Sequence, residues 1–172
     1  MRFEGLAYRA HNPAWSFDPL SGEGAKNQGG RFNPKGVPAL YLSLSQTGAL
    51  AEYNQGFPHR PQPVTLCGYN IDCDDIVNLN DPEELIRFGI SVVELNCAWE
   101  LLASEKKLPP TWALSIFLID NNYSGIIAPS FARNAPTGSS NLVLWDWGDT
   151  LPHQVKLIDD DKRLPKDKSS WE

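Results

Sequence analysis

The sequence has few of the residues that build metal centres or disulfide frameworks. It holds three cysteines and three histidines among 172 residues. These residues are Cys67, Cys73, Cys97, His11, His59 and His153. The cysteines are odd in number and lack a C-x-x-C spacing, which is typical of buried or incidental thiols in a reducing compartment. No histidine stands at a ligand-like spacing from a cysteine, so we expect no zinc site and no other metal.

Long apolar runs are also absent. No stretch approaches the roughly 20 apolar residues that a membrane-spanning helix needs. The first residues, MRFEGLAYRAHNPAW, lack the apolar core and the small-residue cleavage site of a secretory signal. We therefore expect a cytoplasmic protein that does not associate with membranes.

The acidic charge balance argues against a nucleic-acid partner. The net charge is −6, with six Lys or Arg and four Asp or Glu in residues 1–60, a local balance of +2. The remaining nine basic and seventeen acidic residues give residues 61–172 a balance of −8. Phosphate contacts dominate DNA and RNA affinity, and an acidic surface suits them poorly. A locally basic first third suits a small anionic ligand, so we expect a nucleotide-sized substrate and no direct nucleic-acid contact.

Length and composition indicate one α+β domain. The chain is long enough for one domain and short for two, and its 14 prolines and 13 glycines favour many short elements. The almost wholly charged end leaves residues 1–158 for the domain and 159–172 for a solvated tail. Apolar patterns predict strands near residues 5–10, 38–44, 64–71, 75–79, 125–130, 141–147 and 153–159. Strands predominate at both ends, so we expect central strands with flanking helices.

Capping residues and loop composition complete the expected organisation. Ser45 and Asp81 are each placed to begin a helix, and Thr111 is expected to begin another. Residues 11–36 are rich in Gly, Pro, Asn and Ser and lack periodicity. We expect them to form a long loop, and a loop of this length is usually functional.

The segment GGRFNPKG places Arg31 directly after two glycines. Paired glycines let the backbone approach a ligand, and the arginine offers a rigid fork of donors. Such a fork suits a pyrophosphate, or the ribose and carboxamide oxygens of a dinucleotide. The segment matches neither the G-x-G-x-x-G nor the P-loop motif. A tight turn whose arginine pairs with a surface acid is the alternative interpretation.

Glu52 follows in ALAEYNQ, on a largely apolar helix. Tyr41 and Ser43 lie on the strand before this helix, and His59 and Arg60 come soon after it. Together they offer a carboxylate, an aromatic face, a hydroxyl, a titratable ring and a cation. We take them as candidate site residues, while ordinary solvation of a helix surface is the alternative for the glutamate.

Ser130 stands where a strand ends, in IIAPSFAR. The sequence has no G-x-S-x-G elbow and no credible Asp–His pairing, so we interpret Ser130 as an orienting group rather than as an activated nucleophile. A turn serine bonded to its own backbone is the alternative.

Taken in order, these separated motifs resemble the RES family. They are YRA at 8–10, PLSGEGAKNQGGRFNPKG at 19–36, ALYLSLSQTGALAEY at 39–53, DIVNLNDP at 75–82, SGIIAPSFAR at 124–133 and NLVLW at 141–145. The family takes its name from an arginine, a glutamate and a serine, matched here by Arg31, Glu52 and Ser130. The similarity spans about residues 5 to 147.

The resemblance implies a bacterial toxin. RES proteins are the toxin halves of toxin–antitoxin pairs, and their fold is similar to that of ADP-ribosyltransferase toxins. Members consume NAD⁺ as a substrate, without a further cofactor, by hydrolysis or phosphorolysis of the nicotinamide–ribose bond. Some are described as transferring ADP-ribose to a protein. The implied partner is an Xre-like antitoxin with a DNA-binding helix-turn-helix, and a toxin homodimer within the complex is implied as well.

The resemblance also implies roles for the four principal residues. Arg31 would hold NAD⁺, Tyr41 would stack on the nicotinamide ring, Glu52 would act at the anomeric carbon, and Ser130 would orient the ribose or the nicotinamide. Cleavage releases a neutral nicotinamide through an oxocarbenium-like transition state. One carboxylate, one arginine and one aromatic face are therefore enough for this chemistry.

Further residues complete the expected NAD⁺-binding set. Arg9, in YRA, matches a family position and would add a phosphate contact. Phe32 stands where the family often has an indole, so stacking would be kept and a hydrogen bond lost. Ser43, His59 and Arg60 are included as neighbours of the same site.

Other functions stay open at the level of sequence. The same site could deliver ADP-ribose to a cellular protein, or the chain could be a non-catalytic module that holds a nucleotide or an antitoxin. An RNA-cleaving toxin is disfavoured by the acidic balance and by the lack of a paired-histidine site. Hydrolysis, phosphorolysis and transfer differ only in whether water, phosphate or a side chain reaches the anomeric carbon.

Overall fold

Seven strands form one mixed sheet in residues 1–56 and 59–169, the part of the chain that the computed structural model describes. The strands are β1 (Phe3–His11), β2 (Leu40–Ser43), β3 (Thr65–Cys73), β4 (Ile76–Asn78), β5 (Gly125–Pro129), β6 (Ser140–Leu144) and β7 (His153–Leu157). Their order is β4-β5-β6-β2-β1-β3-β7, and only the β4–β5 pair is parallel. The expected α+β class with central strands is confirmed.

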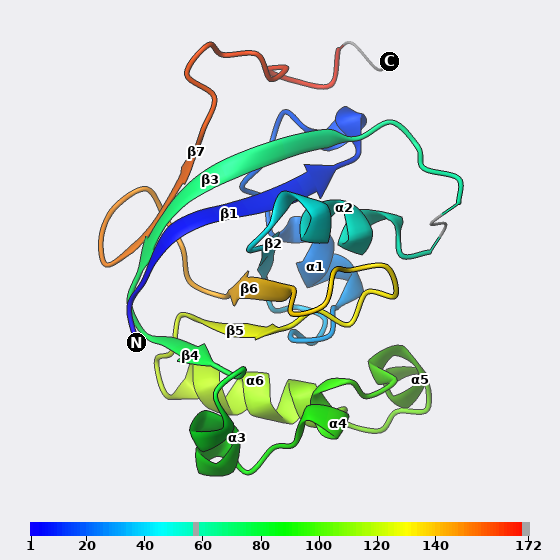
Figure 1. The fold of residues 1–172 in the computed structure, drawn as a ribbon, viewed down its shortest axis with the longest axis vertical. Coiled ribbons are helices and arrows are strands. Elements are labelled where there is room, and N and C mark those ends of the chain that lie inside the picture. The colour runs from blue at the N-terminus through cyan, green and yellow to red at the C-terminus, as the bar shows by residue number, and fades with distance from the viewer. Residues whose placement is uncertain (57–58, 170–172) are drawn as a thin grey trace.

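The helices gather in two places around the sheet. They are the 3₁₀ helix η1 (Pro13–Trp15), α1 (Glu23–Gln28), α2 (Gln46–Asn54), α3 (Pro82–Phe88), α4 (Val92–Leu95), α5 (Trp99–Ser104) and α6 (Pro110–Asp120). Helices α3 to α6 all fall between β4 and β5, and Figure 1 shows them together at one end of the molecule. Helix α2 lies against β1 and β2. Among the described helices, none has the length and apolar character required to cross a membrane.

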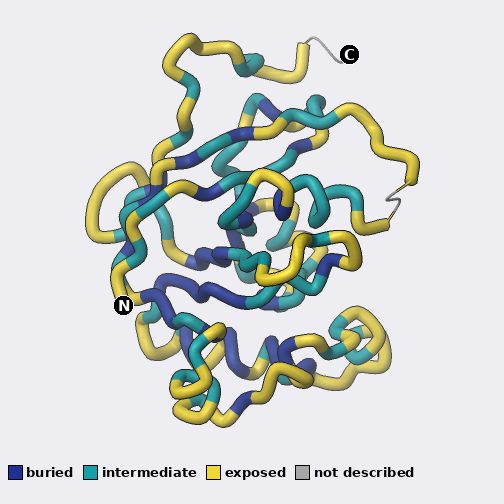
Figure 2. The backbone as a smooth tube through the Cα atoms, in the orientation of Figure 1, coloured by how far each residue is buried: buried dark blue, intermediate teal, exposed yellow. Residues whose placement is uncertain are grey.

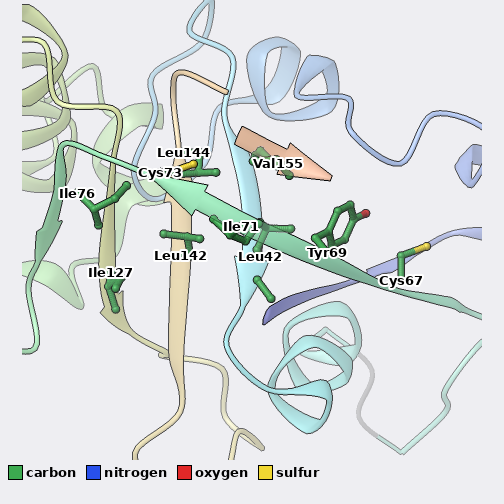
Figure 3. Close-up of a cluster of buried hydrophobic side chains, with 12 residues drawn as sticks. Leu42, Cys67, Tyr69, Ile71, Cys73, Ile76, Ile127, Leu142, Leu144 and Val155 are labelled. Carbon is green, nitrogen blue, oxygen red and sulfur yellow. The ribbon is translucent and has the colours of Figure 1, made fainter. Parts of the chain in front are cut away.

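Alternation along the central strands directs apolar side chains into two cores. On β6, Leu142 and Leu144 join one cluster, while Val143 between them joins the other. Figure 3 shows the first cluster, in which Leu142 lies near its register partner Leu42 and Leu144 lies beside Cys73. The second cluster contains apolar residues of α4 and α6. Figure 2 shows that the central strands are largely buried, whereas much of the helical end is exposed. The sheet is therefore a rigid support, packed from both faces, for side chains at its rim.

Two of the expected helix starts are confirmed by their caps. The Ser45 hydroxyl accepts a hydrogen bond from the Gly48 amide at 3.0 Å, at the start of α2. The Asp81 carboxylate accepts one from the Glu83 amide at 2.9 Å, at the start of α3. Each cap satisfies an amide that has no partner inside its own helix, which is why these residues mark helix starts in a sequence.

Two other expectations were wrong. Thr111 is not a cap, because α6 already begins at Pro110 and Thr111 is fully buried in its first turn. The expected long loop over 11–36 contains η1 and α1 rather than irregular backbone throughout. Helix α1 is held from outside, since the Asn33 side-chain amide donates to the Ala25 carbonyl at 2.9 Å. A tertiary hydrogen bond thus supports a helix too short to show periodicity in the sequence.

The charged tail touches the domain at separate points. Leu164 packs against the first core, and its amide donates to the Asp159 carboxylate at 3.1 Å. The Lys168 ammonium lies 3.6 Å from the centre of the Trp15 ring, a cation–π contact. Residues 170–172 of the expected tail lie outside the described residues. The described part of the tail therefore combines solvated charge with an anchored leucine.

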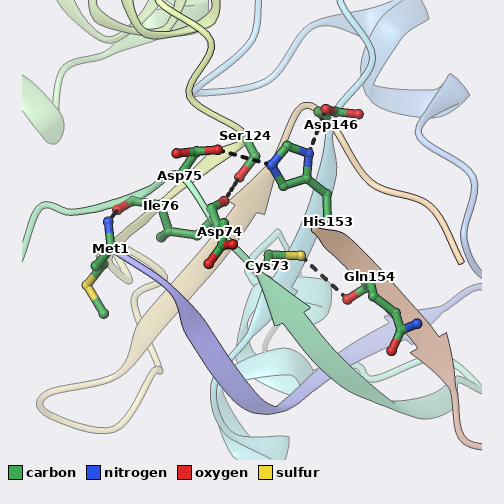
Figure 4. Close-up of polar contacts among 9 residues, drawn as sticks. All are labelled: Met1, Cys73, Asp74, Asp75, Ile76, Ser124, Asp146, His153 and Gln154. Carbon is green, nitrogen blue, oxygen red and sulfur yellow. Dashed lines mark hydrogen bonds and ion pairs between the residues drawn. The ribbon is translucent and has the colours of Figure 1, made fainter. Parts of the chain in front are cut away.

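Polar contacts tie the starts of β1, β4 and β7 together (Figure 4). The amino group of Met1 donates to the Ile76 carbonyl at 2.7 Å. His153 Nδ1 lies 2.7 Å from Asp146 Oδ2, and its Nε2 lies 3.4 Å from Asp75 Oδ2. These contacts join strand ends, and none of the five residues lines the pocket described below.

His11 is a buried histidine whose charged form is unfavourable in the folded protein. It is 6% exposed, and its Nε2 lies 2.8 Å from the Tyr69 hydroxyl. That hydroxyl donates its only proton to the Pro19 carbonyl at 2.7 Å, so His11 Nε2 donates to Tyr69. Burial, and secondarily the charge of Arg9, lowers the pKa of His11 to about 4.

We predict that His11 makes stability fall as the solution is acidified. An unfolded histidine titrates near pH 6.5, so between about pH 6.5 and pH 4 the unfolded chain binds a proton that the folded chain does not. The contribution of neutral His11 to the free energy of unfolding is fully present above pH 6.5 and is lost as the pH falls toward 4. Its size is at most about 3 kcal/mol. Urea unfolding at pH 7 and pH 4.5 measures it. His11→Gln should reduce the difference between the two pH values, whereas His59→Gln, at an exposed histidine, should not. An unchanged difference in His11→Gln would assign the effect to other groups.

Candidate functional site

A pocket of about 600 Å³ opens at the rim of the sheet, where β1, β2, β5 and β6 meet α2 and the segment after α1. It gathers charged and polar side chains from separate parts of the chain. Among its lining residues are Arg9, Arg31, Tyr41, Ser43, Glu52 and Asn141. Most of the residues expected to bind or cleave the substrate therefore meet in one place.

Helix α2 brings Glu52 close to the sheet because Gly48 has no side chain. A Cβ at Gly48 would collide with the hydroxyl of Ser43, which is 2% exposed. A larger residue would push α2 away from β2. The absence of a side chain thus sets how far Glu52, one helical turn later, stands from the strands.

The Glu52 carboxylate is held by two donors on the same oxygen. Its Oε1 accepts a hydrogen bond from Ser130 Oγ at 2.6 Å and another from Asn141 Nδ2 at 2.6 Å. Within the described residues no hydrogen bond to Oε2 occurs. The protein thus fixes one carboxylate oxygen, and the other has no hydrogen-bond partner in this part of the chain.

Asn141 makes its contact at a cost. Its Oδ1 atom is buried and has no hydrogen-bond partner among the described residues. An unpaired buried amide oxygen costs about 1–3 kcal/mol. The sheet places this residue by register, since Asn141 is paired with Ser43 on one side and with Ala128 on the other. A costly amide in a strand, where asparagine is disfavoured, is typical of a functional position.

Arg31 is anchored by the connection between α4 and α5. Its Nη1 donates to the Leu95 carbonyl at 3.0 Å and to the Cys97 carbonyl at 2.8 Å. Its guanidinium carbon lies 5.0 Å from the centre of the Phe131 ring. Burial lowers the pKa of Arg31, and the nearby acidic groups, among them Glu52, oppose that effect. The guanidinium is therefore a partly desolvated, oriented cation at the pocket wall.

Two tryptophans fix the backbone on either side of Arg31. Trp112 Nε1 donates to the Gly30 carbonyl at 2.7 Å, and Trp145 Nε1 donates to the Phe32 carbonyl at 2.9 Å. Arg31 is thus held by its main chain as well as by its guanidinium, and little freedom is left to lose when a ligand binds.

Tyr41 uses its hydroxyl for structure. The group donates to Asn33 Oδ1 at 2.7 Å and accepts from the Phe32 amide at 2.9 Å. A Cβ at Gly30 would lie 2.5 Å from this hydroxyl, so the close approach requires glycine. Burial raises the pKa of Tyr41 well above its usual value. What Tyr41 can offer a ligand is therefore its ring and not an ionised oxygen.

Arg9 lies on the β1 side of the pocket. Its Nη1 donates to the Ser21 carbonyl at 2.9 Å, and burial lowers its pKa. Like Arg31, it is a partly desolvated cation fixed by a backbone carbonyl, which suits an anionic ligand. Among the described residues, no group of His, Cys, Asp and Glu side chains is arranged to hold a metal ion.

Three expected NAD⁺-binding residues lie in places that differ from the expectation. Phe32 lines the pocket, but it is 4% exposed and belongs to the second core, so little of its ring is free for stacking on a substrate. His59 and Arg60 are exposed and do not line the pocket. Helix α2 ends at Asn54, and these two polar side chains remain solvated beyond it. Their closeness to Glu52 in sequence does not become closeness in space.

Sequence reasoning also missed residues that the structure brings to the site. Asn141, Phe131, Trp99 and Glu100 line the pocket. The available signal was an asparagine inside an apolar strand, NLVLW, where its residue type is unusual. No pattern in the sequence links Trp99 to Arg31, because the hydrogen bonds of Arg31 to the Leu95 and Cys97 carbonyls bring these two segments together only in the fold.

Comparisons with known proteins agree with this architecture. The sequence model of the RES domain family matches residues 6–167. No curated protein sequence matches the chain. Among solved structures, a chain in the crystal structure of the M. tuberculosis MbcT–MbcA toxin–antitoxin complex is 22% identical, with a TM-score of 0.63. The alignment covers 92% of this chain and 84% of that chain, and it shows a shared fold.

Proposed function

The chain belongs to the RES family, and from this premise we propose that it is a toxin that cleaves the nicotinamide–ribose bond of NAD⁺. The observation that carries the proposal is the Glu52 carboxylate, held through Oε1 by Ser130 and Asn141. This carboxylate shares a pocket of about 600 Å³ with the anchored Arg31, a volume within the range of small-molecule binding sites.

Glu52 would stabilise the charge that develops on the ribose. As the bond from C1′ to the nicotinamide nitrogen breaks, both electrons leave with neutral nicotinamide, and the ribose becomes oxocarbenium-like. Oε2 of a fixed carboxylate offsets that positive charge without having to reorient. Water or phosphate then bonds to C1′, and the proton lost by attacking water passes to the carboxylate or to solvent.

Arg31 would hold the diphosphate. Its hydrogen bonds to the Leu95 and Cys97 carbonyls both use Nη1, so its other nitrogens can face phosphate oxygens while the guanidinium stays anchored. Binding energy from a part of the substrate that does not react can then be used to orient the ribose against Glu52. Tyr41 would supply the stacking face for nicotinamide, since its hydroxyl is already engaged.

We assign Ser130 a role that differs from the orientation of the ribose or nicotinamide that the resemblance implied. Its hydroxyl donates to Glu52 and does not line the pocket. We assign it, together with Asn141, to positioning the carboxylate rather than to contacting the ribose.

The proposed partner is an antitoxin. The structural neighbour comes from a toxin–antitoxin complex. For this chain we propose an Xre-like antitoxin, the partner that the family resemblance implies. The balance of −8 over residues 61–172 favours a partner segment with basic character.

The direct test incubates the purified protein with NAD⁺, with and without phosphate, and identifies the products by mass. Nicotinamide with ADP-ribose is expected for hydrolysis, and nicotinamide with ADP-ribose 1″-phosphate for phosphorolysis. Nicotinamide with a mass increment on a protein would instead mark an ADP-ribosyltransferase. Folded protein that releases no nicotinamide under any condition would refute the proposal.

A further inference from the structure

A second groove, of about 730 Å³, adjoins the catalytic pocket. Among its lining residues are Gln28, Gly29, Lys35, Trp99, Glu100 and Trp112. Gln28, Gly29, Trp99 and Glu100 line both cavities, so the pocket and the groove adjoin along these four residues and are together called the cleft.

The wall of this groove is aromatic. The rings of Trp99 and Trp112 lie with their centroids 6.1 Å apart at an interplanar angle of 40°. Trp112 is structural, because its indole N–H supports the Gly30 carbonyl. Trp99 is partly exposed, and no hydrogen bond of its side chain is recorded within the described residues. Trp99 therefore presents a free aromatic surface at the junction of the two cavities.

Charged groups stand beside this aromatic surface. Lys35 and Glu100 are both exposed on the groove, and no ion pair joins either of them to another described residue. A carboxylate next to an aromatic ring suits a ribose with free hydroxyls, because those hydroxyls donate to the carboxylate while the base stacks.

Arg31 lies on the pocket side of the junction. Arg31 and Glu52 line the pocket and not the groove, whereas Trp99 and Glu100 line both. Arg31 is bound to the carbonyls of Leu95 and Cys97, just before α5 begins at Trp99. The order along the cleft is thus a carboxylate, a fixed cation and an aromatic ring with a second carboxylate.

A dinucleotide has the matching order. From its reacting end it presents the nicotinamide ribose, the diphosphate, and then a ribose and a purine. We propose that the groove between α1 and α5 is the subsite for the adenosine half of the substrate, with adenine stacked on Trp99 and the adenosine ribose held by Glu100. The inference that this subsite serves NAD⁺ cleavage rests on the proposed function. The inference that it binds an adenine nucleotide does not.

The kinetic test compares NAD⁺ with nicotinamide mononucleotide, which has the same reacting bond and no adenosine. Trp99→Ala should lower kcat/KM for NAD⁺ about ten- to a hundredfold, mainly through KM, and should lower kcat/KM for the mononucleotide far less. Trp99→Phe keeps a stacking face and should retain most of the activity toward NAD⁺. Trp15→Ala, at an exposed tryptophan outside both cavities, is the matched control and should change neither substrate.

A binding measurement keeps the subsite testable without turnover. AMP titrated by calorimetry should bind the wild-type chain and Trp15→Ala equally, and Trp99→Ala at least about tenfold more weakly. Equal AMP affinity in all three proteins, or an equal loss of activity toward both substrates in Trp99→Ala, would overturn the subsite. If the protein releases no nicotinamide but Trp99→Ala still binds AMP more weakly than the wild type, the proposed reaction is refuted and the proposed subsite is supported.

Discussion

Glu52→Gln is expected to lower nicotinamide release from NAD⁺ about a thousandfold or more while leaving the fold intact. The substitution removes the negative charge that faces the ribose, and the loss of one preorganised electrostatic contact or one acid–base group costs about 10²–10⁴-fold in rate. The loss should appear in kcat, because a charge that meets the developing cation acts in the transition state. Chromatographic assay of nicotinamide under saturating NAD⁺ measures it.

The fold should survive because the side-chain oxygen of glutamine can replace Oε1. It can still accept from Ser130 and Asn141, whose donors lie 2.6 Å away in the wild-type protein. Urea unfolding should therefore give a midpoint close to that of the wild type. Glu105→Gln, at an exposed glutamate paired with Lys107, is the matched control and should keep full activity. Undiminished nicotinamide release by Glu52→Gln would remove Glu52 from its role.

Asn141→Ala is expected to give the second largest loss, about ten- to a hundredfold in kcat with KM little changed. The reason is positional, since the variant releases one of the two donors that hold Oε1 and lets the carboxylate rotate away from the ribose. Removal of the unpaired Oδ1 also relieves a buried polar atom, so the loss of activity should not come with a large loss of stability.

Ser130 provides the internal check on this prediction. If both residues act on the same carboxylate, their effects on kcat should not be additive. The loss of kcat in the double variant Ser130→Ala/Asn141→Ala, expressed as a free energy, should differ from the sum of the losses in the two single variants. Asn80→Ala is the matched control, because the Asn80 amide donates to Ser140 Oγ at 3.1 Å and lies outside the pocket. A rise in KM with an unchanged kcat in Asn141→Ala would instead make Asn141 a substrate-binding residue.

Much of the fold could be predicted because its signals are local. The Ser45 and Asp81 caps concern amides within three residues of the cap, and strand alternation concerns neighbours two residues apart. Helix α1 escaped prediction because Asn33 supports it through a tertiary contact. The start of α6 was expected at Thr111, although its true first residue, Pro110, is itself a local helix-start signal.

The candidate site was predictable only in part. The expected residues that line one pocket are Arg9, Arg31, Phe32, Tyr41, Ser43 and Glu52. His59 and Arg60 were included because they follow Glu52 closely, and the end of α2 leaves them in solvent. Proximity along the chain is a poor guide to a site once a helix has ended.

By itself, the sequence determined the strands, two helix starts, the family and the residue types that carry the chemistry. The tertiary structure decided which of those residues touch. Glu52 meets Ser130 and Asn141 across separations of 78 and 89 residues, and these contacts depend on the position of α2 and on the register of β6 between β2 and β5. Register and helix placement result from packing the whole core, so a residue such as Asn141 gains its role only after the chain has folded.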